Sequence, residues 1–339
     1  MTEGGGARAD GLVVVERHLR TVDSARWNAF AERNRSSVRL TTGHLRGWAV
    51  KHVGRRRLRL FEVHAGGGAS GDVVAQCAVG TAGTDHVFLD RLVLAPSAGP
   101  WPPVMAAVLT AVGPGTFSYG WELSMEPPRE DDIAAIPGVT VTRVRPMVVE
   151  AVDFAAWPTW EEYWRAISTN VRRNVKKAQN EIDGLQLDVR SGLGSLRHVP
   201  TIIRLRSTMY RRKGLRFRRT AAAVSAVAGI VSARRYALTA VATSSAGPMA
   251  AFHGLEFAGS TYYADGGSQA GNSGAAWYLI TRMAQRAYDA HPHGRFVMGY
   301  VEPAIHDEAV GGGLLRSRRS MRVTSYPTST VTFIRAGAS

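Results

Sequence analysis

A tryptophan-rich stretch at residues 157–190, WPTWEEYWRAISTNVRRNVKKAQNEIDGLQLDVR, constrains the fold of this chain more than any other segment. Thr159 and Glu162 have the spacing of a capping box, which satisfies the first backbone N–H groups of a helix. Apolar residues then recur every three or four positions and share one stripe: Trp160, Tyr163, Trp164, Ile167, Val171, Val175 and Ala178. The opposite side is basic, with Arg165, Arg172, Arg173, Lys176 and Lys177. The pattern predicts a helix that buries one face and exposes cations on the other.

The same stretch contains two further signals, one for the start of a second helix and one for the end of the helical pattern. Asn170, which follows Ser168 and Thr169, is placed to cap a second helix, so the stretch is either one rod or two helices with a bend. Gly184 ends the helical pattern, and residues 185–189 alternate like a strand. The simplest alternative for the basic face is a solvated helix surface with no ligand.

Length and composition bound the class of protein. A chain of 339 residues exceeds one ordinary core and fits two domains, and its 45% hydrophobic content is that of a globular protein. No run of about 18 apolar residues is present, and the N-terminal residues lack a signal-peptide core, so we expect no membrane insertion. A single cysteine, Cys77, excludes an internal disulfide and favours the cytoplasm. The histidines form no HExxH motif, so no metal site is expected.

The charge is concentrated in the second half of the chain. Residues 1–156 hold 17 Lys and Arg against 16 Asp and Glu, a net charge of +1, whereas residues 157–339 hold 25 against 11, a net charge of +14. Within that half, residues 165–219 carry 15 basic and three acidic side chains. Charge concentrated in this way attracts a polyanion.

The order of predicted elements indicates two α/β (α+β) domains in tandem. We expect a disordered tail at residues 1–10, a first domain at 11–150 and a second domain at 151–339. In the first domain, residues 139–144 and 147–154 are predicted to be separate strands, and the glycine-rich loop at 65–71 lacks the Lys and Ser/Thr of a phosphate-binding loop. In the second, strands are predicted at 236–243, 248–256, 260–265 and 295–300, with a long helix beginning at Gly274.

The stretch VVEAVDF followed by WEEYWRAISTNVRRNVKKAQ resembles the start of the second domain of Fem-type aminoacyltransferases and their CelD-like relatives. The shared motif is R-x-N-x-(K/R)-K-A, found here at residues 172–178. The likeness continues in YYADGGS at 262–268 and covers roughly residues 148–325. It implies tandem GNAT-like domains, each a mixed twisted sheet flanked by helices, and acyl transfer to an amine. The acyl donor would be an aminoacyl-tRNA or coenzyme A.

The two donors make different demands on the sequence. Coenzyme A-dependent GNAT enzymes usually bind pyrophosphate through Q/R-x-x-G-x-G/A, and no such motif occurs in this chain. A tRNA needs a broad basic surface, with aromatic or arginine side chains that stack on its single-stranded CCA end. Tyr210 and Phe217 lie among basic residues in the +14 half. We therefore expect aminoacyl-tRNA to contact Arg172, Arg173, Lys176, Lys177, Arg204, Arg211, Arg212, Lys213, Arg216, Arg218 and Arg219.

The candidate catalytic groups follow two predicted strands. A general base must remove the ammonium proton of the amine, and the candidates are Asp265, Glu302 and His306. For Asp265 the alternative is a turn-capping role, and for Glu302 and His306 a surface loop. The resemblance places a cation on the donor phosphate near residues 311–319, which points to Arg316 and Arg319. Tyr210 and Tyr263 are expected to line the substrate pocket.

The leading hypothesis is therefore an aminoacyl-tRNA-dependent transferase that forms an amide bond with an amine. The domain at 11–150 would be a degenerate GNAT-like domain on the acceptor side, and the basic domain at 151–339 would be on the acyl-donor side. The chain lacks the long helical arm of some cell-wall Fem enzymes, so the resemblance favours a small-molecule or peptide acceptor, as in antibiotic biosynthesis. Two alternatives stay open, namely a coenzyme A-dependent N-acyltransferase and a non-catalytic RNA-binding protein. We expect a monomer that binds no DNA and needs no cofactor beyond its acyl donor.

Overall fold

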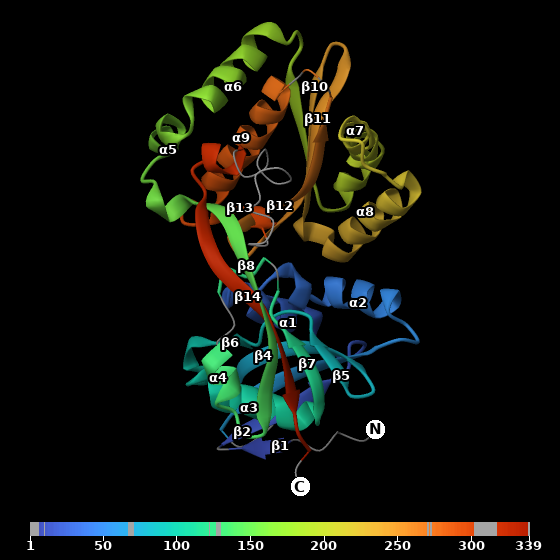
Figure 1. The fold of residues 1–339 in the computed structure, drawn as a ribbon, viewed down its shortest axis with the longest axis vertical. Helices are drawn as coiled ribbons and strands as arrows, with labels where there is room; N and C mark the ends of the chain where they lie inside the picture. Colours follow the sequence, from blue (N-terminus) through green and yellow to red (C-terminus); the bar gives the residue numbers. More distant parts are fainter. Residues whose placement is uncertain are drawn as a thin grey trace. The chain divides into compact units, whose positions relative to one another are not determined.

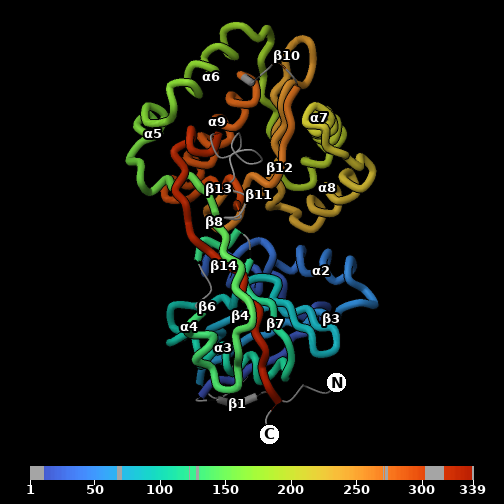
Figure 2. The backbone as a smooth tube through the Cα atoms, viewed as in Figure 1, coloured from blue at the N-terminus to red at the C-terminus, as the bar shows by residue number. Residues whose placement is uncertain are grey.

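The computed structural model describes residues 7–9, 11–66, 71–121, 123–126, 130–269, 271, 273–301 and 317–337. The chain divides into two compact units (Figures 1 and 2). Unit 1 comprises Met1–Met147 and Pro327–Ser339, and unit 2 comprises Val148–Tyr326. The sequence analysis gave everything after residue 150 to the second domain, whereas the last 13 residues cluster with unit 1. Of the tail expected to be disordered, Ala7–Ala9 form a strand and the other residues lie outside the described part.

Unit 1 is a mixed sheet with helices on both faces. Its strands run in the order β1-β2-β3-β4-β5-β7-β14, with β6 beside β4, and among the described residues of this unit only β5 and β7 pair in parallel. The strands are β1 (Ala7–Ala9), β2 (Leu12–Arg17), β3 (Arg57–Ala65), β4 (Val73–Ala82), β5 (Asp85–Phe88), β6 (Val93–Leu94), β7 (Gly115–Tyr119) and β14 (Thr324–Arg335). The helices are α1 (Ser24–Arg33), α2 (Thr42–Lys51), α3 (Trp101–Val112) and α4 (Glu130–Ala134), with short 3-10 helices at Val38–Leu40 and Pro96–Ala98.

The strands β3 and β4 are buried on both faces of the unit 1 sheet. Phe61 and Cys77 lie on the face that packs against α3, where they join Met105 and Phe117 in one buried cluster. The opposite face is covered by α1 and α2, and the buried Trp27 of α1 donates its indole N–H to the carbonyl of Leu40 at 2.6 Å. Burial on both faces accounts for the near-continuous apolar run of β4.

Unit 2 repeats this architecture. Its strands run in the order β8-β13-β12-β11-β10-β9, with β12 and β13 parallel and the other pairs antiparallel. The strands are β8 (Val139–Asp153), β9 (Gln186–Ser191), β10 (Ala237–Ser244), β11 (Gly247–Phe257), β12 (Ser260–Ser268) and β13 (Arg295–Val301). The helices are α5 (Trp160–Ala166), α6 (Thr169–Glu181), α7 (Val199–Arg212), α8 (Arg219–Ala233) and α9 (Ser273–Ala290), with 3-10 helices at Phe154–Ala156, Gly192–His198 and Arg234–Tyr236. These mixed sheets confirm the predicted α/β class.

The two faces of the unit 2 sheet carry different helices. The helix α9 packs on one face and α6 packs on α9, and this side holds the main core, which includes Val171, Phe252 and Met283. The helix α7 packs on β11 and β12 from the other side, with α8 beside it, and buries Ile202 and Leu205 against the sheet. The strand β12 therefore lies between α9 on one face and α7 on the other.

The tryptophan-rich stretch forms two helices with a bend. The Thr159 hydroxyl accepts from the Glu162 N–H at 3.2 Å at the start of α5, as the capping box predicts. The cap of α6 is Ser168, whose hydroxyl accepts from the Asn170 N–H at 3.3 Å, so the prediction that Asn170 is the cap was wrong by two residues. A further hydrogen bond fixes the bend, because the Ser168 N–H donates to the carbonyl of Ser320 at 3.0 Å.

Two strands are longer than their sequence patterns suggest. The predicted strands at 139–144 and 147–154 form one strand, β8, because the fixed φ of Pro146 is compatible with an extended chain and removes only one N–H donor. The strand β12 continues past Asp265 to Ser268, where Gly266 and Gly267 are buried. A Cβ on Gly267 would lie 2.6 Å from the backbone N of Arg206, so the glycine permits α7 to approach the strand.

The packing of α6 generates a prediction about stability. Val171 is fully buried, so replacing it with Ala should lower the free energy of unfolding by about 2 kcal/mol through lost burial and a residual cavity. Val224 on α8 is 70% exposed and provides the same substitution as a control. Val224→Ala should change the free energy of unfolding by less than about 0.5 kcal/mol in urea denaturation. Equal effects of the two changes would contradict the assigned faces of α6.

Candidate functional site

The parallel strands β12 and β13 separate in the middle of the unit 2 sheet. Their recorded pairing runs from Ser260–Arg295 to Tyr262–Val297 and stops there, although β12 continues to Ser268 and β13 to Val301. A register shift on each strand accompanies the separation, with Ala264 unpaired against β11 and Met298 unpaired against β8. The backbone beyond Tyr262 is thereby released from its parallel neighbour, next to the residues that the sequence analysis proposed as catalytic.

The bulge at Ala264 decides which way the neighbouring side chains point. In a regular strand Tyr263 and Asp265 would share a face, but one extra residue reverses the alternation. Tyr263 stacks on Phe252 of the α9-side core, with ring centroids 5.3 Å apart. Asp265 instead pairs with Arg206 of α7. The two residues of the YYADGGS motif therefore serve opposite faces of the sheet.

Asp265 is held by two groups on the α7 side. Its carboxylate forms an ion pair with the Arg206 guanidinium and accepts from the Gly266 N–H at 2.7 Å. Burial raises the pKa of Asp265 above its ordinary value, and the charge of Arg206 opposes that shift. His253 on β11 is the residue directly opposite Asp265 in the antiparallel register, which places their Cβ atoms about 4.5–5.5 Å apart.

His253 is a functional candidate that the sequence analysis missed. Burial lowers the pKa of this imidazole below its ordinary value of 6.5, and the positive charge of Arg206 lowers it further. Among the described residues no hydrogen bond or ion pair engages the ring. This imidazole is therefore neutral at neutral pH, and its ring nitrogens are free to accept a proton.

Arg206 connects this pair to two aromatic rings. Its Cζ lies 5.9 Å from the ring centroid of Tyr210 and 5.2 Å from that of Phe217, and the two rings are 5.0 Å apart. Cation–π contact and the ion pair with Asp265 together fix the guanidinium. Tyr210 therefore lies on the α7 side, on the opposite face of the sheet from Tyr263, so the structure does not bring the two predicted pocket tyrosines together.

The α9 side of the separation holds a phenol and a buried ion pair. Burial raises the pKa of Tyr263 to about 12, helped by the charge of Asp265, so its hydroxyl remains a donor at neutral pH. Arg318 pairs with Glu150 of β8 at 2.9 Å, and both side chains are less than 10% exposed. A Cβ on Gly299 would lie 2.5 Å from a terminal nitrogen of Arg318, so this glycine makes room for the guanidinium beside β13.

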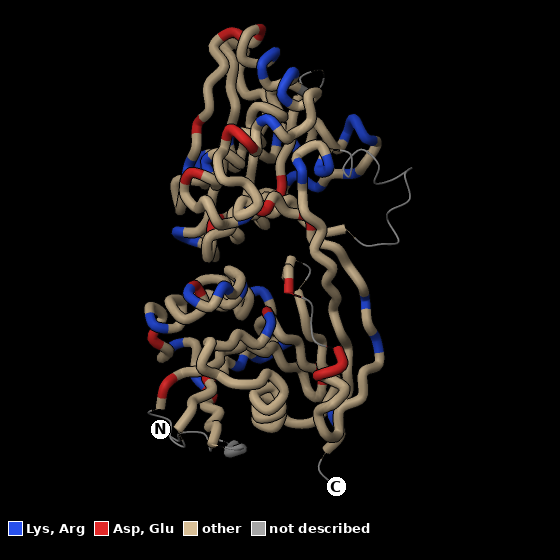
Figure 3. Tube along the Cα trace, turned by 90° about the vertical axis from the view of Figure 1, so that its left-hand side faces the viewer, with Lys and Arg blue, Asp and Glu red and all other residues tan. Residues whose placement is uncertain are grey.

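The predicted tRNA-binding cations lie in separate segments of unit 2 (Figure 3). On α6, Arg173, Lys176 and Lys177 are exposed, and Arg172 is half-buried. Lys177 lies 3.6 Å from Glu181 in a surface pair, which contributes little to stability. On the other side of the sheet, exposed cations occupy the end of α7 and the segment to α8: Arg211, Arg212, Lys213, Arg216, Arg218 and Arg219.

The two helices that carry these cations border the start of α9. Gly274 of α9 is packed against α6, because a Cβ there would lie 3.1 Å from the carbonyl oxygen of Asn174. From the α7 side, Arg212 donates to the carbonyl of Gln269, just before α9, at 3.4 Å. The start of α9 thus lies between the buried stripe of α6, whose exposed cations are on its other side, and the cationic end of α7.

Several predicted residues lie elsewhere or outside the described part. Glu302, His306 and Arg316 fall in residues 302–316, which the structure does not describe. Arg319 is exposed on a helical turn at 317–320, and the buried member of that arginine cluster is Arg318. No local sequence motif marks the functional candidates Arg206, His253 and Arg318. The absence of any acid between Asp188 and Glu256 was the one signal that Arg206 needs a distant partner.

Two openings in unit 2 lie away from the candidate site. Openings of about 520 and 300 Å³ lie along α9, and Asp265, His253 and Arg206 line neither of them. Within the described residues, no three His, Cys, Asp or Glu side chains gather as a metal site. Among those residues there is also no helix with the length and apolar character needed to cross a membrane.

Comparison with known proteins identifies the fold. No protein-family model and no curated sequence matches the chain. A crystal structure of FemX matches 93% of this chain and 96% of its own with a TM-score of 0.68 at 10% identity. The C-terminal domain of a putative lysylphosphatidylglycerol synthetase from Agrobacterium fabrum matches 93% and 92% of the two chains with a TM-score of 0.53 at 14% identity.

A tandem GNAT protein from the clavulanic acid biosynthesis pathway covers 97% of this chain and 99% of its own, with a TM-score of 0.51 at 10% identity. These likenesses agree with the resemblance seen in residues 148–325. The chain therefore has the tandem fold of the Fem-type and GNAT acyltransferases.

Proposed function

We propose that this protein is an aminoacyltransferase that moves an aminoacyl group from aminoacyl-tRNA to an amine of a small molecule or peptide. The observation that carries the proposal is the arrangement around Arg206. On one side Arg206 contacts the Asp265 carboxylate, and on the other it contacts two aromatic rings at the end of a cationic helix. This spatial order of groups suits an acyl donor that has a polyanionic body and aromatic bases at the end that carries the acyl group.

The end of α7 suits the CCA terminus of a tRNA. Unpaired RNA bases stack on aromatic and arginine side chains, and the duplex stem is held through its phosphates. Tyr210 and Phe217 supply the aromatic rings, while the exposed cations at 211–219 and on α6 supply the phosphate contacts. The start of α9, which lies between these two helices, adds backbone N–H groups and a positive helix end.

Coenzyme A is the alternative donor, and a non-catalytic RNA-binding protein is the third hypothesis. The chain lacks the usual pyrophosphate motif, and the cations cover a surface larger than one pyrophosphate needs. The name of one structural neighbour, a lysylphosphatidylglycerol synthetase, refers to a lysyl group joined to an acceptor. That name and the shared fold support aminoacyl transfer without identifying the amino acid or the acceptor.

The proposed reaction forms one bond and breaks one. The amine nitrogen attacks the ester carbonyl, the C–N bond forms, and the bond from the carbonyl carbon to the ribose oxygen breaks. His253 accepts the proton that the amine loses, because its imidazole is neutral, while Asp265 fixes Arg206 and attracts the incoming ammonium. The ribose oxygen must gain a proton as it leaves, and the protonated His253 returns to it the proton taken from the amine.

Binding of tRNA should depend steeply on salt. If about six phosphates are contacted, the affinity should fall roughly a thousandfold between 50 and 200 mM salt. Replacing Arg173 and Lys177 with Glu should weaken binding, because both side chains are exposed on α6 and face no buried acid. Filter binding of the same tRNA at several salt concentrations measures both effects.

The matched control reverses the same charge in unit 1. Arg20 and Arg26 are exposed there, and replacing both with Glu should leave the salt dependence nearly unchanged. If both double variants weaken tRNA binding equally, net charge rather than the α6 surface determines the affinity. An affinity that does not change with salt would remove the phosphate contacts from the account.

The pH profile of transfer tests His253. The neutral imidazole accepts the proton, and its pKa lies below 6.5, so the single-turnover rate should be flat at neutral pH and fall as the pH drops through that lowered pKa. His253→Gln should reduce the rate by about 10²–10⁴ and abolish the acidic fall. Asp265→Asn tests the second role, since it should slow transfer while tRNA affinity stays nearly constant. A His253→Gln enzyme with the unchanged pH profile would assign the base elsewhere.

A further inference from the structure

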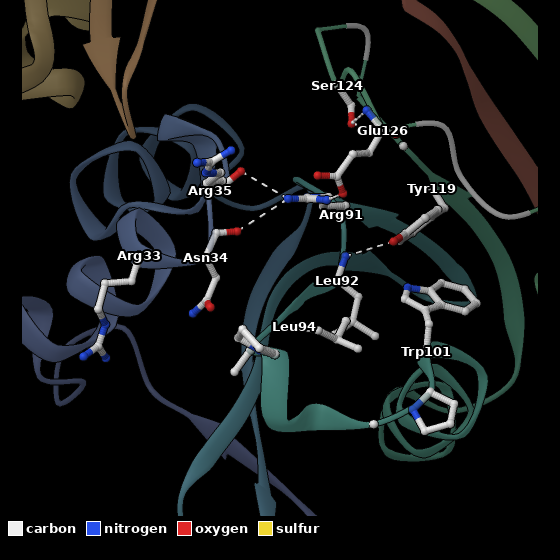
Figure 4. Close-up of a pocket in the computed structure, with 15 residues that line it drawn as sticks. Arg33, Asn34, Arg35, Arg91, Leu92, Leu94, Trp101, Tyr119, Ser124 and Glu126 are labelled. Atoms are coloured by element: carbon white, nitrogen blue, oxygen red, sulfur yellow. Dashed lines mark hydrogen bonds and ion pairs between the residues drawn. The ribbon is translucent and has the colours of Figure 1, made fainter. Parts of the chain in front are cut away.

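Unit 1 contains a cavity of about 510 Å³ that the proposed transfer chemistry does not use (Figure 4). It opens where the parallel strands β5 and β7 end, and is enclosed by the end of α1, the segment after β5, the start of α3 and the segment after β7. All of its lining residues belong to unit 1. This volume lies within the range of small-molecule sites.

The inner wall of the cavity is apolar and rigidly held. Trp101 and Tyr119 meet edge to face with their ring centroids 6.0 Å apart. The Tyr119 hydroxyl accepts from the Leu92 N–H at 3.0 Å, which fixes the ring against the backbone of the same wall. Leu92 and Leu94 complete this surface (Figure 4). A ligand that enters this far must present an apolar body.

The rim of the cavity carries three arginines and one acid. Arg91 forms an ion pair with Glu126 and donates to the carbonyl of Arg35 at 3.1 Å, so its guanidinium is anchored on the end of α1. The side chain of Arg91 is 21% exposed, whereas that of Glu126 is 66% exposed. Glu126 can leave the pair at small cost, because exposed ion pairs contribute little. Arg33 and Arg35 add two further positive charges.

The start of α3 offers few donors to an anion. Anions at a helix start are bound by free backbone N–H groups. Here Pro100, Pro102 and Pro103 occupy the N-cap and two of the first three helical positions, and proline has no N–H. The anion-binding groups are therefore the arginines of the rim, and the planar fork of Arg91 pairs with a carboxylate, as it already does with that of Glu126.

We propose that this cavity binds a small molecule with one carboxylate and an apolar body. The carboxylate of the ligand replaces Glu126 on Arg91, and the body packs on Trp101 and Tyr119. Glu126 occupies the anion position of Arg91 when no ligand is bound. The cavity lies in unit 1, whereas the residues assigned to proton transfer and donor binding lie in unit 2.

The test is direct binding to the full chain by isothermal titration calorimetry. The probes are 3-phenylpropionate, its neutral analogue 3-phenylpropionamide, and L-phenylalanine, which adds an amine. The wild-type protein should bind 3-phenylpropionate and bind the amide at least tenfold more weakly, because the charged hydrogen bonds are lost. Equal affinity for the two, or no binding of either, would overturn the proposal.

Two variants separate the roles of the ion pair. Arg91→Gln should weaken 3-phenylpropionate at least tenfold, while Arg33→Gln, on the exposed rim, should change its affinity less than about threefold. Glu126→Gln should tighten it about two- to fivefold, because the internal competitor is removed. This last variant keeps the test decisive if Arg91→Gln lowers the thermal stability. Weaker binding by Glu126→Gln, or binding of L-phenylalanine alone, would contradict the exchange.

Discussion

The organisation of unit 2 depends on the end of backbone pairing between β12 and β13. Two parallel strands that continued in register would bury Tyr263, Ala264 and Asp265 in a regular sheet. Because the pairing stops at Tyr262 and Ala264 is unpaired against β11, the next residues serve opposite faces. The consequence is one strand that supplies a carboxylate to α7 and a phenol to the α9-side core. The catalytic candidates all follow from this local loss of pairing.

The two sides of the separation are stabilised in different ways. On the α7 side, Arg206 pairs with the Asp265 carboxylate and contacts the rings of Tyr210 and Phe217. Gly267 lets the helix α7 approach the strand β12. On the other side, the buried Arg318–Glu150 pair holds the segment after residue 316 against β8 and β13, and removing either partner would leave a buried charge unpaired. The bend between α5 and α6 is attached to the same segment through Ser320. The tryptophan-rich stretch thus supports the site from a distance.

The sequence predicted best those features that depend on nearby residues. The Thr159 cap, the buried stripe of α6 and the strand–helix order are local patterns, and the structure contains all three. Asp265 was selected because its motif is local too. The partnership of Arg206 and His253 with Asp265 depends on strand register and on a helix about 60 residues earlier, which periodicity does not encode. The strands predicted separately at 139–144 and 147–154 are one strand, because extended backbone tolerates the fixed φ of Pro146.

The central claim is that an aminoacyl group leaves tRNA at the His253–Arg206–Asp265 group. Its most direct test compares two labelled donors, a pool of pre-charged aminoacyl-tRNAs and acetyl-coenzyme A, each incubated with the protein and a mixture of cellular amines. The account predicts label transferred to an amine from the tRNA pool, abolished by prior ribonuclease treatment and by His253→Gln. Transfer from acetyl-coenzyme A alone, or ribonuclease-resistant transfer, would contradict it.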